Sequence, residues 1–156
     1  MATSLSMKSD AVELKSLSEL RSALQDGIRK CGEVAFSVAN STLRKTILNL
    51  ERQSSQYVSE INAQIEALGG KPNCISLPQR LALNFAGLKR SPTNNLEKQA
   101  LKVCRKIESS VIHLYSKILR ESLENENLKK LIQYQMNGIM RTTLQLKLLS
   151  EFLHNQ

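Results

Sequence analysis

The sequence LRKTILNLERQSSQYVSEINAQIEALGGKP, residues 43–72, decides the fold class. Apolar side chains recur in it at steps of three and four residues, the spacing of one face of an α-helix. That face is predicted to carry Leu43, Ile47, Leu50, Ser54, Tyr57, Ile61, Ile65 and Leu68. Gly69, Gly70 and Pro72 predict the helix end, because glycine adopts the left-handed backbone there and proline cannot continue a helix. A helix with one long apolar face needs partner helices to cover it.

Three further segments show the same periodicity, at about residues 16–39, 95–121 and 126–153. Ser16 with Glu19 forms a capping box that would begin the first helix, although Asp10 with Glu13 permits an earlier start. Asn94 and Asn125 are the expected caps of the last two helices. We therefore expect a flexible or partly helical segment over residues 1–15 and a single domain over 16–153.

Composition favours the same all-α class. The 156 residues are 41% hydrophobic, enough for one core, and include only six Gly and three Pro, too few for the turns of a many-stranded β domain. Aromatic residues make up 4% without any Trp, which leaves little for stacking single-stranded nucleic acid. No run approaches a membrane span, and the first residues lack the features of a signal peptide.

The long connection between the second and third helices predicts the wiring. Residues 69–93 contain all three prolines, and the apolar spacing in 78–89 predicts a short helix begun by Pro78. Two helical hairpins joined by one such crossover form a four-helix bundle of ferritin-like topology.

Several residues in this frame resemble an uncharacterised bacterial family of ferritin-like four-helix-bundle proteins. The resemblance covers roughly residues 17–150 and is carried by Asp26, Gly27, Ile28, the segment 57–60, the helix end 67–72, Arg80, Cys104, Glu108 and Tyr115. Membership would imply the ferritin-like fold, a cytoplasmic location and frequent self-association. The family has no established reaction to transfer.

A ferritin-like di-metal centre would need inward carboxylates and Glu-x-x-His pairs from the four helices. Only Glu108 on the third helix has apolar helical neighbours on both sides, so we expect its carboxyl inside the bundle. A lone buried carboxyl is costly when ionised, so it should be protonated or paired with Gln135 or Tyr57. We therefore predict a buried polar layer of Glu108, Gln135, Ser54 and Tyr57, with no metal or other cofactor.

Other chemical motifs are weak. Glu151 and His154 form a Glu-x-x-His pair, but it lies at a helix end where helices fray, and His113 is expected to face solvent. Cys31, Cys74 and Cys104 are too widely spaced for a metal or redox motif. We expect two of these thiols to be buried and Cys74, in the connection, to be exposed. No catalytic residues are predicted.

Positive charge gathers in the middle of the chain. Residues 71–106 hold eight basic side chains and one acidic one, so they supply seven of the eight net positive charges. Six of the basic residues form a candidate anion-binding patch: Lys89, Arg90, Lys98, Lys102, Arg105 and Lys106. An anionic partner, either nucleic acid or an acidic protein, is one interpretation, and a solvated helix face that aids solubility is the other.

The sequence thus predicts a non-enzymatic, self-associating structural or binding protein of the cytoplasm, with a possible link to stress and no membrane partner. Two alternatives remain open. The first is a di-metal-binding, ferroxidase-type protein. The second is weak, nonspecific binding of nucleic acid or another polyanion through residues 71–106.

Overall fold

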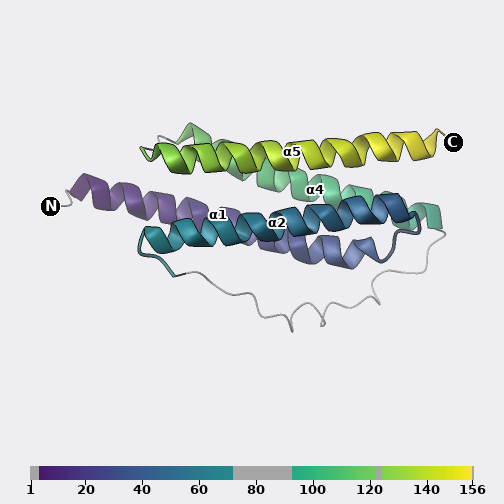
Figure 1. Cartoon of the computed structure of the whole chain (residues 1–156), viewed down its shortest axis with the longest axis horizontal. Helices are drawn as coiled ribbons and strands as arrows, with labels where there is room; N and C mark the ends of the chain where they lie inside the picture. Colours follow the sequence, from purple (N-terminus) through teal and green to yellow (C-terminus); the bar gives the residue numbers. More distant parts are fainter. Residues whose placement is uncertain (1–3, 72–92, 122–123, 156) are drawn as a thin grey trace.

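The computed structural model describes residues 4–71, 93–121 and 124–155. These ranges contain four helices and no strand: α1 (Ser4–Ala35), α2 (Ser41–Ala67), α4 (Thr93–Arg120) and α5 (Glu126–His154). The predicted all-α, four-helix architecture is confirmed, and Figure 1 shows the four helices side by side as one elongated bundle. The short helix predicted at 78–89 lies outside the described residues.

Local sequence signals set several helix ends. The Asn40 and Asn125 side chains accept hydrogen bonds from the backbone N–H groups of Leu43 and Leu128, so they cap α2 and α5. Gly69 adopts φ 86° just after α2, the left-handed conformation expected at this stop.

The start of the first helix differs from the capping-box prediction. Helix α1 already begins at Ser4, so Ser16 lies inside it and caps nothing. The Ser16 hydroxyl instead donates a 3.0 Å hydrogen bond to the Glu121 carboxylate near the end of α4. A contact between distant parts of the chain therefore explains this serine better than its local sequence does.

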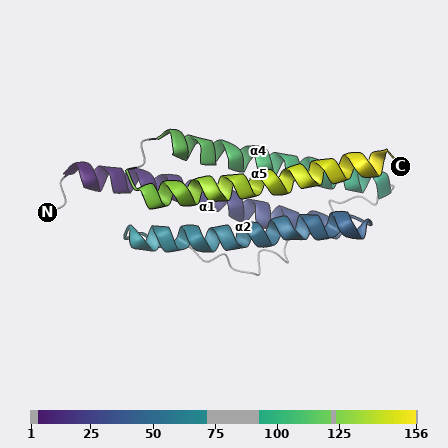
Figure 2. The ribbon, with the colours of Figure 1, turned by 45° about the horizontal axis from the view of Figure 1, so that its top comes forward.

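Each helix packs against two antiparallel neighbours. Helices α1 and α5 each contact both α2 and α4, and α2 and α4 run in the same direction on opposite corners of the bundle (Figures 1 and 2). Helix α2 ends at the end of the bundle where α4 also ends, and α4 begins at the opposite one. The α1–α2 and α4–α5 pairs are thus two antiparallel hairpins placed against each other.

The core is aliphatic and runs the length of the bundle. Its largest fully buried side chains are Leu17, Leu20, Leu24, Leu43, Ile47, Leu50, Ile61, Ile65, Tyr115, Leu128, Ile132 and Ile139. Burying each of the Leu and Ile side chains stabilises the fold by roughly 1.5–3 kcal/mol. None of the helices in the described part of the chain is long and apolar enough to cross a membrane.

Candidate functional site

A polar cluster lies inside the bundle and joins three helices. The Gln135 side chain on α5 is fully buried, and its Oε1 atom accepts a 2.9 Å hydrogen bond from the Tyr115 hydroxyl on α4. Its Nε2 atom donates to Glu60 Oε1 at 3.0 Å and to the Tyr57 carbonyl at 3.3 Å, both on α2. We call Gln135, Tyr115, Tyr57 and Glu60 the Gln135 cluster. Because the amide oxygen and both amide protons are used, the buried Gln135 is stably accommodated.

Burial shifts the titration of both tyrosines in this cluster. The pKa of Tyr115 lies above its usual range, mainly because burial disfavours the phenolate, with smaller contributions from Tyr57 and Glu60. The pKa of Tyr57 is also raised, chiefly by burial and then by the nearby Tyr134, whose ring packs edge-on at 6.1 Å. Both hydroxyls therefore stay protonated at neutral pH.

The predicted polar layer is brought together only in part. Gln135, Tyr57 and Ser54 are buried on neighbouring helices as expected, with Ser54 one turn before Tyr57. Sequence reasoning missed the roles of Tyr115 and Glu60. Tyr115 was named only through the family resemblance, while Glu60 lies outside the apolar stripe of its helix and carries no local signal.

The expected burial of Glu108 is wrong. Its side chain is only half-buried and lines a groove of about 770 Å³ between α4 and α5, rather than joining Gln135. The buried face of α4 contains Cys104, Ile107 and Val111. Glu108 follows Ile107 directly, and each residue advances a helix by about 100°, so the Glu108 carboxyl points away from that face. Apolar helical neighbours placed Glu108 beside the core but did not place it inside.

A second candidate site is a basic groove of about 520 Å³ between α1 and α4. Its charged lining residues are Lys102, Arg105 and Lys106 from α4 and Lys30 and Asp26 from α1. We call this cavity the basic groove, and its four cationic side chains are Lys30, Lys102, Arg105 and Lys106. Three of these side chains belong to the predicted patch, whereas Lys30 comes from the other hairpin and no local sequence pattern links it to the rest.

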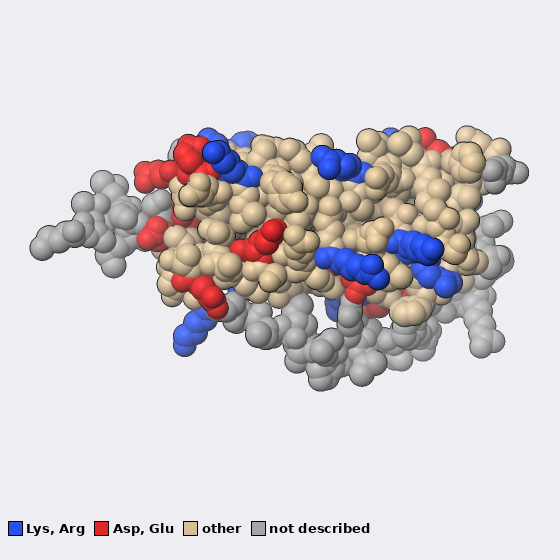
Figure 3. Space-filling model, in the orientation of Figure 1, with Lys and Arg blue, Asp and Glu red and all other residues tan. Residues whose placement is uncertain are grey.

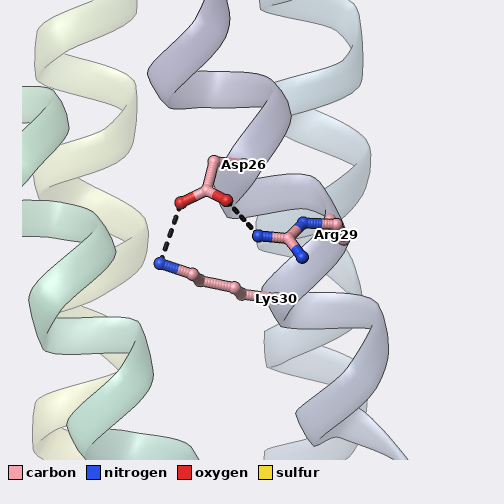
Figure 4. Close-up of polar contacts among 3 residues, drawn as sticks. All are labelled: Asp26, Arg29 and Lys30. Atoms are coloured by element: carbon pink, nitrogen blue, oxygen red, sulfur yellow. Dashed lines mark hydrogen bonds and ion pairs between the residues drawn. The ribbon is translucent and has the colours of Figure 1, made fainter. Parts of the chain in front are cut away.

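Asp26 anchors the α1 side of this groove. Its carboxylate pairs with Arg29 and with Lys30, the latter at 2.8 Å, and Figure 4 shows it held between the two cations. Partial burial alone would raise the pKa of Asp26, but the hydrogen bonds from Lys30 and Arg29 outweigh that effect and lower it. The carboxylate is thus ionised and fixes the position of Lys30 at the groove.

The other members of the predicted patch are less informative. Lys98 is exposed on α4, one turn before Lys102, but does not line the basic groove. Lys89 and Arg90 lie outside the described residues, as does Cys74. His113 is exposed as predicted, and Cys31 and Cys104 are buried as predicted.

A third feature is a set of exposed apolar side chains on α5. The large side chains of this set are about half exposed or more: Tyr134 60%, Met140 48%, Leu144 53%, Leu148 56% and Phe152 61%. We call these five residues the α5 face. Figure 3 shows that the surface over the C-terminal half of α5 is largely free of charged atoms. Sequence reasoning did not single out this set.

Metal-ligating side chains are scattered. Within residues 4–71, 93–121 and 124–155, no three His, Cys, Asp or Glu side chains gather closely enough to hold a metal ion. Helix α5 contributes Gln135 to the bundle centre where a di-metal site would need a carboxylate or imidazole. The described helices therefore provide no set of ligands that would support a di-metal site.

Comparison with known proteins adds no relative. No protein-family model matches the chain, and no curated protein matches it.

Proposed function

We propose that this chain is a non-enzymatic bundle of ferritin-like wiring that self-associates through the α5 face and acts as a structural or binding protein in the cytoplasm. The wiring is supported by the directions of the helices, because two hairpins with parallel α2 and α4 are what a single long crossover produces. A reducing compartment suits the two buried thiols, Cys31 and Cys104.

The exposure of the α5 face carries the proposal. Five large apolar side chains along one helix, each about half exposed or more, form a surface of the kind that marks protein interfaces. Met140, Leu144, Leu148 and Phe152 follow one another at four-residue steps, so they form a continuous exposed row along α5, and Met140 and Leu144 also line the α4–α5 groove. Covering this row would remove apolar surface from water, which is the main driving force of association.

Charge favours a second copy of the same chain as the occupant. Lys130 lies near the start of α5 and Glu151 near its end, both exposed. In an antiparallel pairing about a two-fold axis, Lys130 faces Glu151 of the partner subunit. In this register the two-fold axis passes between Met140 and Arg141. The charged pair thus defines one register that can be tested.

Sedimentation analysis of the full chain tests this proposal. The wild type should be a dimer or a larger closed assembly, and Leu144→Lys combined with Leu148→Lys should shift it to monomer without loss of helix. Val12→Lys is the matched control, since Val12 is 55% exposed on α1, outside the α5 face. A wild type that stays monomeric at all concentrations would refute self-association.

The register has its own test. Lys130→Glu should weaken the dimer by placing like charges together, and Lys130→Glu with Glu151→Lys should restore it. If the charge swap does not restore association although the lysine substitutions abolish it, the α5 face is used in another arrangement.

A second candidate function is anion binding in the basic groove. The observation that favours it is that Lys30 joins Lys102, Arg105 and Lys106 from a different helix, so the positive charge converges on a concave surface. An anion held there would contact both hairpins of the bundle.

A further inference from the structure

The contacts between α1 and α4 set a regular antiparallel register. Near the start of α1, Ser16 hydrogen-bonds Glu121 close to the end of α4. At the other end, just beyond α1, the backbone N–H of Asn40, the N-cap of α2, donates to the Glu97 carboxylate at 3.3 Å, close to the start of α4. Helices α1 and α4 therefore run antiparallel to each other along the pair.

This register places Cys31 opposite Cys104. Midway along the pair, Gly27 faces Ile107 so closely that a Cβ atom at Gly27 would lie 2.9 Å from the Ile107 Cγ2 atom. Cys31 follows Gly27 by one helical turn, and Cys104 precedes Ile107 by one turn. Because Gly27 brings no side chain, the Ile107 side chain packs directly against the α1 backbone one turn away from both thiols. The Cys31 and Cys104 side chains are themselves in hydrogen-bonding contact, the proximity that a disulfide requires.

The two thiols occupy a shared buried site. The exposed fractions are 1% for Cys31 and 3% for Cys104, and both belong to the hydrophobic core. Hydrogen bonding from Cys31 lowers the pKa of Cys104, and the same contact, together with burial, raises the pKa of Cys31. A thiolate on either residue is stabilised by the S–H group of the other, so the two thiols share one ionisation.

Only Cys104 of this pair lines the α4–α5 groove of about 770 Å³. The charged residues that line this groove are Arg105 and Glu108 on α4 and Arg141 and Lys147 on α5, so the approach to the sulfur carries a net positive charge. This setting gives a small oxidant a route to Cys104 and stabilises an anionic sulfur.

We propose that Cys31 and Cys104 are a peroxide-reactive thiol pair that closes to an intramolecular disulfide between α1 and α4. The Cys104 thiolate attacks one oxygen of hydrogen peroxide, the O–O bond breaks, and Cys104 becomes a sulfenic acid while the departing hydroxide takes up the thiol proton as water. The Cys31 sulfur then attacks the Cys104 sulfur, the S–O bond breaks, and a second water leaves with the Cys31 proton. The two thiols lose two electrons and the peroxide gains them.

The bond would join the two hairpins of the bundle. Helix α1 belongs to the first hairpin and α4 to the second, so oxidation would tie together halves that are otherwise held by packing and by polar contacts such as Ser16 with Glu121. We expect the oxidised protein to melt at a higher temperature than the reduced one.

The test uses the full chain with Cys74→Ser, which removes the third thiol and leaves the pair. Reduced protein is freed of reductant and treated with a small excess of hydrogen peroxide. The expected product has lost both thiols, is lighter by about 2 Da, runs as one chain without reductant and yields a Cys31–Cys104 peptide. Two intact thiols after treatment of the folded protein, or disulfides only between chains, would overturn the proposal.

Single substitutions in the same background separate the two roles. With Cys31→Ala, Cys104 should stop at a sulfenic acid that dimedone traps, and with Cys104→Ala, Cys31 should stay a thiol. Equal peroxide reaction of Cys31 in the second variant would overturn the assignment of Cys104 as the attacking sulfur.

A comparison with urea-unfolded Cys74→Ser protein covers the case in which either alanine variant fails to fold. The folded chain should close the disulfide on the order of tenfold faster than the unfolded one, because the register holds the sulfurs together. Closure that is equally fast or slower in the folded chain would refute a pre-arranged pair.

Discussion

The Tyr115 hydroxyl donates a 2.9 Å hydrogen bond to Gln135 Oε1 in the bundle interior, where neither side chain is exposed. Gln135 extends this contact to α2 through Glu60, so one amide connects three of the four helices. A buried amide or hydroxyl left without a partner is destabilising, so such a cluster favours the one packing that satisfies every member.

Removing both members of this pair should therefore cost less than the sum of the costs of removing each one. We expect Tyr115→Phe to lower the free energy of unfolding by about 1–2 kcal/mol, since Gln135 Oε1 loses its donor. Gln135→Leu should cost about 2–3 kcal/mol, because Tyr115 and Glu60 both lose a partner. The double variant should lose less than the sum of the two, as urea denaturation would show. Strict additivity would mean that the hydrogen bond contributes nothing to stability.

Gln135 and its partner Glu60 show which parts of this cluster could be predicted from the sequence and which could not. Gln135 was predicted as buried because it lies in the centre of an apolar stripe with a clear helical period. Its partner Glu60 could not be found that way, since its role depends on how α2 and α5 are rotated against each other. Periodicity predicts the buried face of a helix to within about one residue. An error of one residue is enough to explain why Glu108 was expected inside the bundle although it lies at the groove.

The position of Glu108 leads to a prediction about stability. Since its carboxyl is half-buried at a groove edge, Glu108→Gln and Glu108→Ala should each change the free energy of unfolding by no more than about 0.5 kcal/mol. Gln135→Ala, at a fully buried position, is the contrasting variant. Thermal and urea denaturation of the three proteins measure the difference. If Glu108→Ala lowered the free energy of unfolding by several kcal/mol, the Glu108 carboxyl would have to be buried in the core.

Gly138 on α5 has no room for a side chain. A Cβ atom there would lie 1.9 Å from the Tyr57 hydroxyl oxygen and 3.1 Å from Gln53 Nε2. Alanine is the better helix former by about 1 kcal/mol, yet we expect Gly138→Ala to destabilise the protein because the Tyr57 ring must move.

Tyr57→Phe provides the matched background, because it removes the oxygen that makes the closest contact. The loss caused by Gly138→Ala should shrink in that background, as chemical denaturation of the four proteins would measure. An equal loss with and without the Tyr57 hydroxyl would assign the effect to some other contact.

Tyr115 should make the bundle sensitive to alkaline pH. Its folded pKa is raised by burial, so its contribution to stability is present below the unfolded value of about 10 and is lost as the pH rises further. Above pH 10 the free energy of unfolding should fall faster in the wild type than in Tyr115→Phe, by up to about 1.4 kcal/mol per pH unit. Urea midpoints of both proteins between pH 8 and pH 11 give the comparison. Parallel curves would show that Tyr115 titrates alike in both states.

The basic groove should bind polyanions by charge alone. Lys30, Lys102, Arg105 and Lys106 converge on one groove without aromatic side chains in its lining, so contacts with phosphate rather than with bases are expected. Binding to duplex DNA should be weak and independent of sequence. Its affinity should fall linearly with salt on a double-logarithmic plot, with a slope set by the number of phosphates neutralised.

Two double variants of equal net charge locate this binding. Lys102→Glu with Lys106→Glu should abolish the salt-dependent binding, whereas Lys45→Glu with Arg52→Glu should keep most of it, because the second pair is exposed on α2 and does not line the groove. Fluorescence anisotropy with labelled DNA over a salt series measures both. Since the net charge changes equally, a difference between the variants must come from position. Equal loss in both would show that overall charge, and not the groove, attracts the anion; a preference for one DNA sequence would contradict recognition by charge alone.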